Sequence, residues 1–225
     1  MTRRNAAERA ATPASAAEAA GGLLVVLSGP SGVGKDAMLK RVLPTVSGLR
    51  RSISVTTRPP RPGEQEGREY FFRSDQEFDR MQAAGELLES AQYLDHRYGT
   101  PKAWVEEQRR NGASVVLEID VQGARQVRAA YPEAVLIFVA PPSWEELRRR
   151  LQARQTEDED VMTRRLRTAE AEVQAARDLT RVGEFPYVIV NDHLGDAVEC
   201  LRAIVLAERC RRHHDVLSAL VQRVR

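Results

Sequence analysis

The residues whose types and spacing most clearly predict chemistry lie between Gly29 and Met38, where the chain reads GPSGVGKDAM. The spacing G-x-x-x-x-G-K is typical of a loop that wraps backbone N–H groups around phosphate oxygens and presents a lysine to them. Glycines permit the positive φ angles and the close backbone approach that such a loop needs. The alternative interpretation is a glycine-rich turn beside an unrelated lysine, and the flanking elements must decide between the two.

Asp36 follows the lysine, where the usual motif has a Ser or Thr hydroxyl that contributes one oxygen ligand to Mg²⁺. A carboxylate is also a hard oxygen ligand, so Asp36 is a candidate metal ligand, directly or through a water molecule. It also brings a negative charge close to a bound triphosphate, which weakens nucleotide binding unless the metal neutralises it. Alternatively, Asp36 only caps the start of the following helix, where Asp is favoured. The sequence leaves both roles open.

A second set of chemical groups lies in and after the loop RPPRPGEQEG, residues 58–67. The three prolines and two glycines of this loop exclude a helix or a central strand. Arg58 and Arg61 are three residues apart, and planar guanidinium groups suit a two-point grip on a monophosphate. Tyr70 and Tyr98 offer phenolic O–H donors for the same group. The alternative for the arginines is a solvated surface loop.

Two acids, Glu118 and Asp120, end the apolar segment SVVLEID. They are two residues apart on a predicted strand, so we expect their side chains to point the same way. Carboxylates at the carboxyl edge of a parallel sheet can orient metal-bound water or receive polar groups of a ligand. For Asp120, the alternative role is the N-cap of the next helix.

The elements that must position these groups alternate along the chain. Apolar runs predict strands at 22–28, 114–120, 134–140 and 187–190, and helical spacing predicts helices at 35–43, 101–111, 121–130, 143–154, 158–178 and from about 195 onward. This alternation is typical of an α/β fold, a parallel sheet covered by helices on both faces. The block 52–100 breaks the rhythm, with a strand at 51–57, further short strands and a helix at 75–84, so we expect an inserted subdomain. In the helix at 143–154, Trp144, Leu147 and Leu151 are predicted to share one apolar face.

Length and composition limit the remaining possibilities. Of the 225 residues, 42% are hydrophobic and 29% are charged, which is ordinary for a soluble globular protein. The net charge of +2 is too balanced to predict a nucleic acid or a membrane as partner. No apolar run approaches the roughly 18 residues of a membrane helix. The two cysteines form no metal pattern, so we expect a reducing, cytoplasmic setting. Residues 1–21 are predicted to be a disordered Ala-rich leader.

The chain resembles the guanylate kinase family in the segments GPSGVGK, SVTTRPPRPGEQEGREYFF, LLESAQYLDHRYGT, VVLEIDVQGARQV, VAPPSWEELRRRL and VIVND. These segments follow that family's order over about residues 22–212. The resemblance implies a P-loop enzyme that moves the γ-phosphoryl group of ATP to GMP, with Mg²⁺ carried in by ATP. It also implies a core of about 22–52 and 113–212, a small α+β GMP-binding insert of about 53–112 and a helical lid of about 152–168. The expected state is a monomer or homodimer, and residues 213–225 are predicted to be a C-terminal helical tail.

The resemblance implies an acceptor site made by Ser54, Arg58, Arg61, Tyr70, Glu89, Tyr98, Thr100, Glu118 and Asp120. Guanine presents N1–H and N2–H₂ donors beside O6, so Glu89 can accept from both donors while Ser54 or Thr100 donates to O6. Adenine has an acceptor at N1 that Glu89 would repel, and unpaired buried polar groups make such discrimination strong. Ordinary strand hydroxyls are the alternative for Ser54 and Thr100. The family usually has Asp at the place of Glu118, which leaves the contact of Glu118 open.

For the donor side, the resemblance implies ATP binding by Gly29, Pro30, Ser31, Gly32, Val33, Gly34, Lys35, Asp36 and Asn191. It implies catalytic roles for Lys35, Arg150, Arg154 and Arg165. Arginines placed at the transferred phosphoryl group stabilise its negative charge. Solvated helix faces are the alternative for these arginines, and a structural turn is the alternative for Asn191. The family commonly has Gly on both sides of the middle arginine, where this chain has Ala153 and Gln155, so a stiffer lid hinge is one expected consequence.

Two rival interpretations belong to other classes. Ribose 1,5-bisphosphate phosphokinases resemble this fold and can carry Asp after the loop lysine, but the acceptor block and Glu89 argue against an acceptor that has no base. Guanylate-kinase-like domains of scaffold proteins bind peptides without catalysis. Those domains usually have damaged phosphate loops, whereas Lys35, Arg58 and Arg61 are all present in this chain. The sequence therefore favours an enzyme that binds ATP and GMP.

Overall fold

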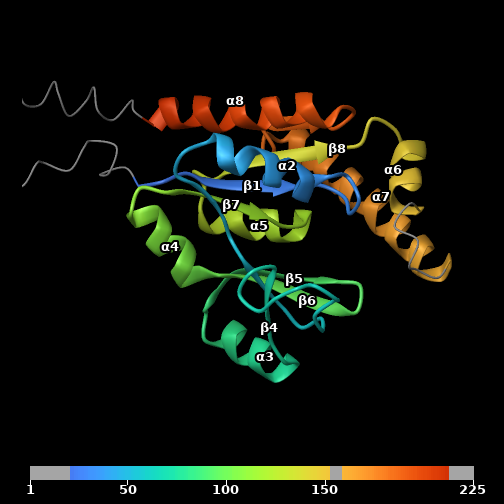
Figure 1. Cartoon of the computed structure of the whole chain (residues 1–225), viewed down its shortest axis with the longest axis horizontal. Coiled ribbons are helices and arrows are strands. Elements are labelled where there is room, and N and C mark those ends of the chain that lie inside the picture. The colour runs from blue at the N-terminus through green and yellow to red at the C-terminus, as the bar shows by residue number, and fades with distance from the viewer. Residues whose placement is uncertain (1–20, 153–158, 213–225) are drawn as a thin grey trace, which may run out of the picture.

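The computed structural model describes residues 21–152 and 159–212, and its centre is a parallel sheet with helices above and below it (Figure 1). The sheet has five strands in the order β2–β7–β1–β8–β9, and every pair is parallel. The strands are β1 (Leu24–Ser28), β2 (Leu49–Arg51), β7 (Ser114–Glu118), β8 (Val135–Ala140) and β9 (Tyr187–Val190). This arrangement confirms the predicted α/β fold class.

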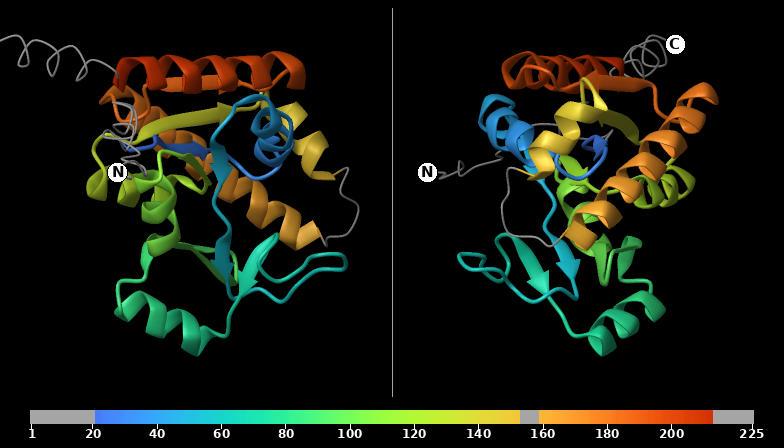
Figure 2. Two further views of the ribbon diagram at one scale, coloured as in Figure 1. Left: turned by 60° about the vertical axis from the view of Figure 1, so that its left-hand side comes forward. Right: turned by 90° about the vertical axis from the view of Figure 1, so that its right-hand side faces the viewer.

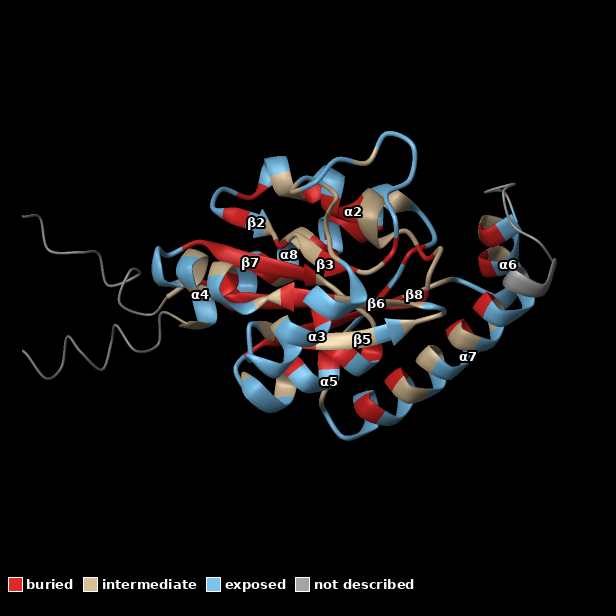
Figure 3. Cartoon of the chain, turned by 90° about the horizontal axis from the view of Figure 1, so that it is seen from below, coloured by how far each residue is buried: buried red, intermediate tan, exposed pale blue. Residues whose placement is uncertain are grey.

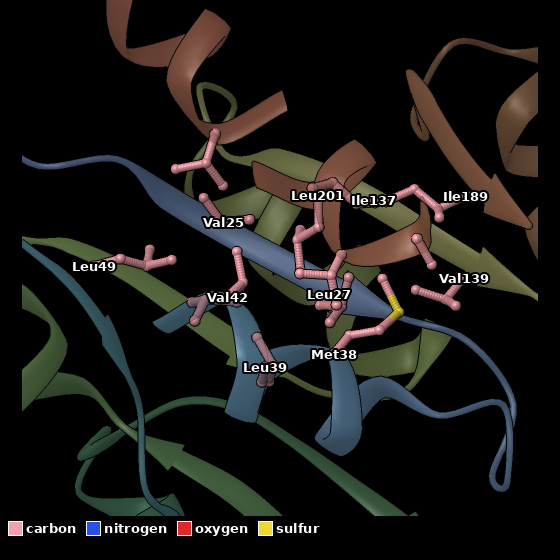
Figure 4. Close-up of a cluster of buried hydrophobic side chains, with 14 of the residues drawn as sticks. Val25, Leu27, Met38, Leu39, Val42, Leu49, Ile137, Val139, Ile189 and Leu201 are labelled. Carbon is pink, nitrogen blue, oxygen red and sulfur yellow. The ribbon is translucent and has the colours of Figure 1, made fainter. Parts of the chain in front are cut away.

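The helices cover the two faces of this sheet because side chains alternate along each strand. Val25 and Leu27 of β1 belong to a buried cluster with residues of α2 and α8, which Figure 4 shows in detail. Leu24 and Val26 belong to a second cluster with residues of α4, α5 and α7. The bounds of these helices are α2 (Lys35–Val42), α4 (Lys102–Arg110), α5 (Val121–Ala130), α7 (Glu159–Arg181) and α8 (Leu194–Arg212). Both faces are buried, as the red strands in Figure 3 show, so the strands are continuous apolar runs in the sequence.

A second, mixed sheet of four strands lies beside the core, below it in both views of Figure 2. Its order is β4–β3–β6–β5, with β3 parallel to β4 and antiparallel to β6. Its elements are β3 (Ser54–Thr56), β4 (Tyr70–Phe72), α3 (Asp75–Ala83), β5 (Leu87–Tyr93) and β6 (His96–Pro101). A capping box, in which Ser74 and Glu77 bond each other's backbone N–H groups, begins α3.

The prediction of one strand at 51–57 is wrong, because this segment belongs to two strands in two different sheets. Arg51 ends β2 in the core sheet and Ser54 begins β3 in the second sheet, so the chain crosses between the sheets at 52–53. The backbone N–H of Ser52 still bonds the carbonyl of Val116 at 3.0 Å, which continues the β2–β7 ladder up to the crossing. Apolar and hydroxyl side chains alternate without interruption in this segment, so its pattern contains no signal of the change of sheet.

Helix α6 (Trp144–Gln152) packs against α7 through a small apolar cluster that contains Leu147 and Leu151 of α6 with Leu166 and Ala169 of α7. Trp144 was predicted to share this face, and it lies about two turns before Leu151, but at the first position of α6 it is 44% exposed and stays outside the buried cluster. Helix α7 extends to Arg181, beyond the predicted end at 178.

Helix α2 ends at Val42, and a 3₁₀ turn at Leu43–Thr45 contains the proline that was predicted to stop it. Across the described part of the chain, no helix combines the length and the hydropathy that a membrane crossing requires.

Candidate functional site

The phosphate loop joins the end of β1 to the start of α2, at the carboxyl edge of the core sheet. Gly29, Gly32 and Gly34 have φ angles of 140°, 83° and 101°, which glycine adopts readily and other residues rarely do. Gly34 is the N-cap of α2, and no side chain caps this helix end, so the first N–H groups of α2 are available to a phosphate. The Nζ atom of Lys35 donates to the carbonyl oxygens of Gly29 and Pro30. The lysine therefore folds back over the loop that it follows.

Asn191, which was predicted as an ATP contact, lies against this loop. Its side chain is 3% exposed, and its Nδ2 atom donates to the carbonyl oxygen of Val33 at 2.8 Å. A Cβ atom on Gly34 would lie 2.4 Å from the same nitrogen, so the loop needs glycine there to admit the amide. Asn191 directly follows β9, and in this structure its side chain contacts the phosphate loop itself.

Helices α6 and α7 also contact the phosphate loop. The Nη2 atom of Arg165 in α7 donates to Oγ of Ser31 at 2.8 Å, and Arg165 is 7% exposed. A Cβ atom on Gly32 would lie 2.7 Å from the side chain of Leu151 in α6. The third and fourth residues of the loop motif therefore lie against α7 and α6, and Arg165 itself belongs to the predicted lid segment.

Arg150 of α6 reaches the same edge of the sheet. Its Nη1 atom donates to the carbonyl oxygen of Asn191 at 2.9 Å, and its Nε atom donates to the carboxylate of Glu146 at 2.6 Å. Arg150 and Arg165 are thus both near the loop, as the predicted catalytic roles require. Arg154, with the neighbouring Ala153 and Gln155, lies outside the described residues.

Glu89 in β5 and Thr100 in β6 form a buried polar pair. The two residues are 5% and 0% exposed, and Oγ1 of Thr100 donates to Oε1 of Glu89 at 2.7 Å. The second oxygen, Oε2, faces the start of α5, because a Cβ atom on Gly123 would lie 2.5 Å from it. Burial raises the pKa of Glu89 to about 7, and the hydrogen bond from Thr100 offsets only part of this rise. The pair therefore presents a carboxyl group that changes charge near neutral pH.

Arg58 lies among aromatic rings and an acid. It is 8% exposed, its Nη2 atom donates to both carboxylate oxygens of Glu64 at 2.8 and 2.9 Å, and its guanidinium carbon lies 5.4 Å from the ring centroid of Tyr70. The rings of Tyr70 and Tyr98 meet edge to face with centroids 5.9 Å apart. The side chain of Arg61 is exposed, although its backbone N–H donates to Glu64 at 2.8 Å. Three of the four predicted monophosphate-binding side chains are thus gathered, and the fourth is at the surface.

The other predicted acceptor residues lie on nearby elements. Ser54 of β3 is paired with Tyr70 of β4. Asp120 is the N-cap of α5, where its Oδ1 atom accepts from the N–H of Gly123 at 2.7 Å, the role that the sequence offered as the alternative. Burial raises the pKa of Asp120 against the backbone hydrogen bonds and the positive charge of Lys35, which lies near enough to act on it. The strand end after β7 is therefore close to the phosphate loop.

Comparisons with known proteins decide the family, since the family model described as guanylate kinase matches residues 22–208. The chain belongs to the guanylate kinase family. A guanylate kinase of Desulfitobacterium hafniense (strain Y51) is 47% identical over 190 residues, which are 84% of this chain and 92% of that protein. One of Symbiobacterium thermophilum is 50% identical over 190 residues, 84% of this chain and 87% of that protein. The crystal structure of guanylate kinase from Anaplasma phagocytophilum has a TM-score of 0.67 at 34% identity and covers 84% of this chain and 87% of that chain.

Within this guanylate kinase fold, one arginine joins the two acids that depart from the usual motifs. Asp36 accepts from Arg51 at 2.8 Å and pairs with Lys40 at 2.8 Å, and Glu118 accepts from Arg51 at 2.7 Å. Because Gly34 is the N-cap of α2, Asp36 is not the cap but an acid in the first turn. The structure gives the Asp36 carboxylate two cationic partners, an arrangement that neither sequence interpretation included.

Three side chains at the guanylate kinase site were not predicted from the sequence. Arg51 has both of its partners on other elements, so nothing local marks it. Glu64 lies six residues after Arg58 in a loop rich in Arg and Glu, and that composition is a signal that could have found it. Glu172 of α7 has a buried Oε2 atom with no hydrogen-bond partner among the described residues. Burial raises the pKa of Glu172 to about 7, against the charge of Lys35.

Proposed function

We propose that this chain transfers the γ-phosphoryl group of ATP to GMP, giving ADP and GDP, in a Mg²⁺-dependent reaction. The observation that carries the proposal is the buried pair of Glu89 and Thr100 in a molecule that also has a glycine-rich phosphate loop with its lysine. A carboxylate accepts from the N1–H and N2–H₂ groups of guanine, and a hydroxyl can donate to O6. Membership of the guanylate kinase family supports the same pair of substrates.

On the donor side, the proposal gives the phosphate loop and Lys35 the polyphosphate of ATP. The uncapped start of α2 supplies backbone N–H donors. Lys35 gives up its hydrogen bonds to the loop carbonyls and donates to phosphate oxygens instead. Arg165 and Arg150 then supply positive charge beside the group in transfer. No protein nucleophile is required, because an oxygen of the GMP phosphate attacks the γ-phosphorus directly.

On the acceptor side, the proposal gives Arg58, Tyr70 and Tyr98 the phosphate of GMP. Glu64 holds the guanidinium of Arg58 by two hydrogen bonds, which orients the arginine and balances its charge before the acceptor binds. The exposed side chain of Arg61 is in the same loop and joins the phosphate site from the surface. The positively charged side chains beside the phosphates of ATP and GMP offset the repulsion between these two anions.

Mg²⁺ would enter with ATP, held mainly by phosphate oxygens and water, and would supply positive charge to the β- and γ-phosphates. The candidate protein ligand from the sequence is Asp36, whose carboxylate is paired with Arg51 and Lys40. The donor chemistry of Asp36 fits the ion, but a direct bond would require it to release one of these cations. Among the described residues, no group of three or more His, Cys, Asp or Glu side chains is arranged as a metal site.

We also propose that the enzyme works in the cytoplasm. Cys200 and Cys210 are free and exposed, and free exposed thiols are typical of proteins in a reducing compartment. Measuring the fraction of the protein in the soluble cytoplasmic extract of its host tests this assignment directly.

The deciding experiment measures ADP release from ATP and Mg²⁺ with GMP, dGMP, AMP, CMP, UMP or ribose 1,5-bisphosphate as acceptor. We expect rapid release with GMP and little with AMP, CMP or UMP, and product analysis should identify GDP. Release without a requirement for GMP, or faster release with ribose 1,5-bisphosphate than with GMP, would refute the proposed function.

A further inference from the structure

Arg51 occupies a bridging position between the phosphate-loop helix and the end of strand β7. Its Nη1 atom donates to Oδ1 of Asp36 at 2.8 Å, and its Nη2 atom donates to Oε2 of Glu118 at 2.7 Å. Lys40 pairs with the other oxygen of Asp36 at 2.8 Å. The side chains of Arg51 and Glu118 are 33% and 20% exposed, so this bridge is partly shielded from solvent.

The strand register explains why Arg51 points toward Asp36. Arg51 is paired with Val116 across β2 and β7, and paired residues of parallel strands present their side chains on the same face. Val116 belongs to the cluster that packs against α2, and Glu118 lies two residues further along the same face of β7. The neighbouring Arg50 points to the opposite face, where it bonds Gln108 of α4 at 2.7 Å. The two adjacent arginines therefore serve different faces of the sheet.

The charge of Asp36 makes this contact consequential. Asp36 directly follows Lys35, the residue to which the proposed function assigns the phosphates of ATP. Arg51 and Lys40 each pair with one oxygen of the Asp36 carboxylate at 2.8 Å, as two cations do around a negative charge. A carboxylate without such partners would repel a polyphosphate. Lys40 is the more exposed of the two cations, so solvent screens it more.

We propose that Arg51 is a positioning residue of the donor site, which ties Asp36 to Glu118 and offsets the negative charge that Asp36 brings to the phosphate loop. The inference rests on the proposed function in taking this loop as the site of ATP. It explains how the chain keeps a carboxylate where a hydroxyl is usual. The acid and the arginine form one unit, so the effect of removing either depends on the presence of the other.

The test is a double-mutant cycle read by equilibrium titration of the full chain with ATP and Mg²⁺, without any acceptor. Arg51→Ala is expected to weaken ATP binding about fivefold at low ionic strength, because only the exposed, solvent-screened Lys40 then offsets the charge of Asp36. The loss should shrink as salt is added, since screening acts on exposed charge. Asp36→Asn in the Arg51→Ala background should restore binding to within about twofold of the unmodified chain. In turnover, Arg51→Ala should raise KM for ATP and leave kcat nearly unchanged.

The matched control is Arg50→Ala, which removes the adjacent arginine from the opposite face and should leave ATP binding unchanged. Arg51→Gln, which keeps the aliphatic stem, replaces Arg51→Ala in the cycle if thermal melts show that the alanine variant is unfolded. ATP binding of Arg51→Ala equal to that of the unmodified chain would overturn the inference, and so would a loss that Asp36→Asn does not repair. Because the titration uses ATP alone, it is decisive even if GMP proves not to be the acceptor, and that result would refute only the proposed function.

Discussion

Arg165 of α7 donates a hydrogen bond to the hydroxyl of Ser31 in the phosphate loop, at 2.8 Å between Nη2 and Oγ. The contact joins residues that are 134 positions apart in the chain. Leu151 of α6 packs on the same loop, where Gly32 leaves no room for a Cβ atom. Helices α6 and α7 therefore already touch the donor loop in this structure, and the guanidinium of Arg165 already lies at that loop.

Arg165→Ala should reduce kcat by about a hundredfold or more, because one donor to the developing negative charge is lost. The matched control is Arg167→Ala, which removes an exposed arginine from the same helix and should leave kcat unchanged. Steady-state kinetics at saturating GMP and ATP measures both variants, and thermal melts check folding. A folded Arg165→Ala variant with normal kcat would exclude Arg165 from the reaction.

Lys35→Ala should reduce turnover at least about a hundredfold, because the loop loses its mobile positive charge at the phosphates. The fold should survive, since among the described residues the lysine donates its hydrogen bonds to loop carbonyls and is not part of the buried cluster beneath α2. Arg41→Ala, an exposed change on the same helix, provides the matched control. The comparison is made by ADP release and by circular dichroism, and normal turnover of Lys35→Ala would remove the loop from the donor role.

The sequence predicted the parts of the fold that local patterns encode. The phosphate loop is recognisable because a glycine-rich segment lies between an apolar strand and a helix, and the continuous apolar runs indicate a doubly covered sheet. The change of sheet after Arg51 was not predictable, since the alternation of RSISVTT is the same on both sides of the crossing. The bridge from Asp36 through Arg51 to Glu118 depends on strand order and register, which no local spacing encodes. The residues proposed for both substrates stay predictions until ligands or variants test them.

Glu89→Gln should reduce the preference for GMP over AMP by roughly tenfold to a hundredfold. The glutamine amide has only one acceptor oxygen, and its NH₂ group cannot accept from the N–H donors of guanine. The same NH₂ group can donate to the N1 acceptor of adenine. The measurement is the ratio of kcat/KM for the two monophosphates. Glu86→Gln, an exposed change three residues earlier, is the matched control and should keep the original ratio. An unchanged ratio in Glu89→Gln would mean that Glu89 does not contact the guanine base.

GMP binding should become weaker as pH falls below about 7, because burial raises the pKa of Glu89 to about 7 and guanine needs the ionised carboxylate. Binding near neutral pH should then release up to one proton, which calorimetry in buffers of different ionisation enthalpy detects. The phosphate of GMP also titrates, with a second pKa of about 6. The same titration with Glu89→Gln lacks the contribution of Glu89, so the difference between the two proteins isolates it. Equal proton release by both would contradict the assignment.

Glu89 should also make the stability of the unliganded protein depend on pH. Its folded pKa of about 7 lies above the ordinary value of 4.5, so its contribution is fully present below pH 4.5 and is lost as pH rises through 7. The loss is on the order of 3 kcal/mol, since one pKa unit corresponds to about 1.4 kcal/mol. Urea unfolding at about pH 5 and pH 8 should therefore show a smaller decrease for Glu89→Gln than for the unmodified chain. Part of the decrease should persist in the variant, because the pKa of Glu172 is also raised to about 7 by burial. An equal decrease in both proteins would mean that Glu89 is ionised in the folded state well below neutral pH, and the proton release expected on GMP binding would then fail with it.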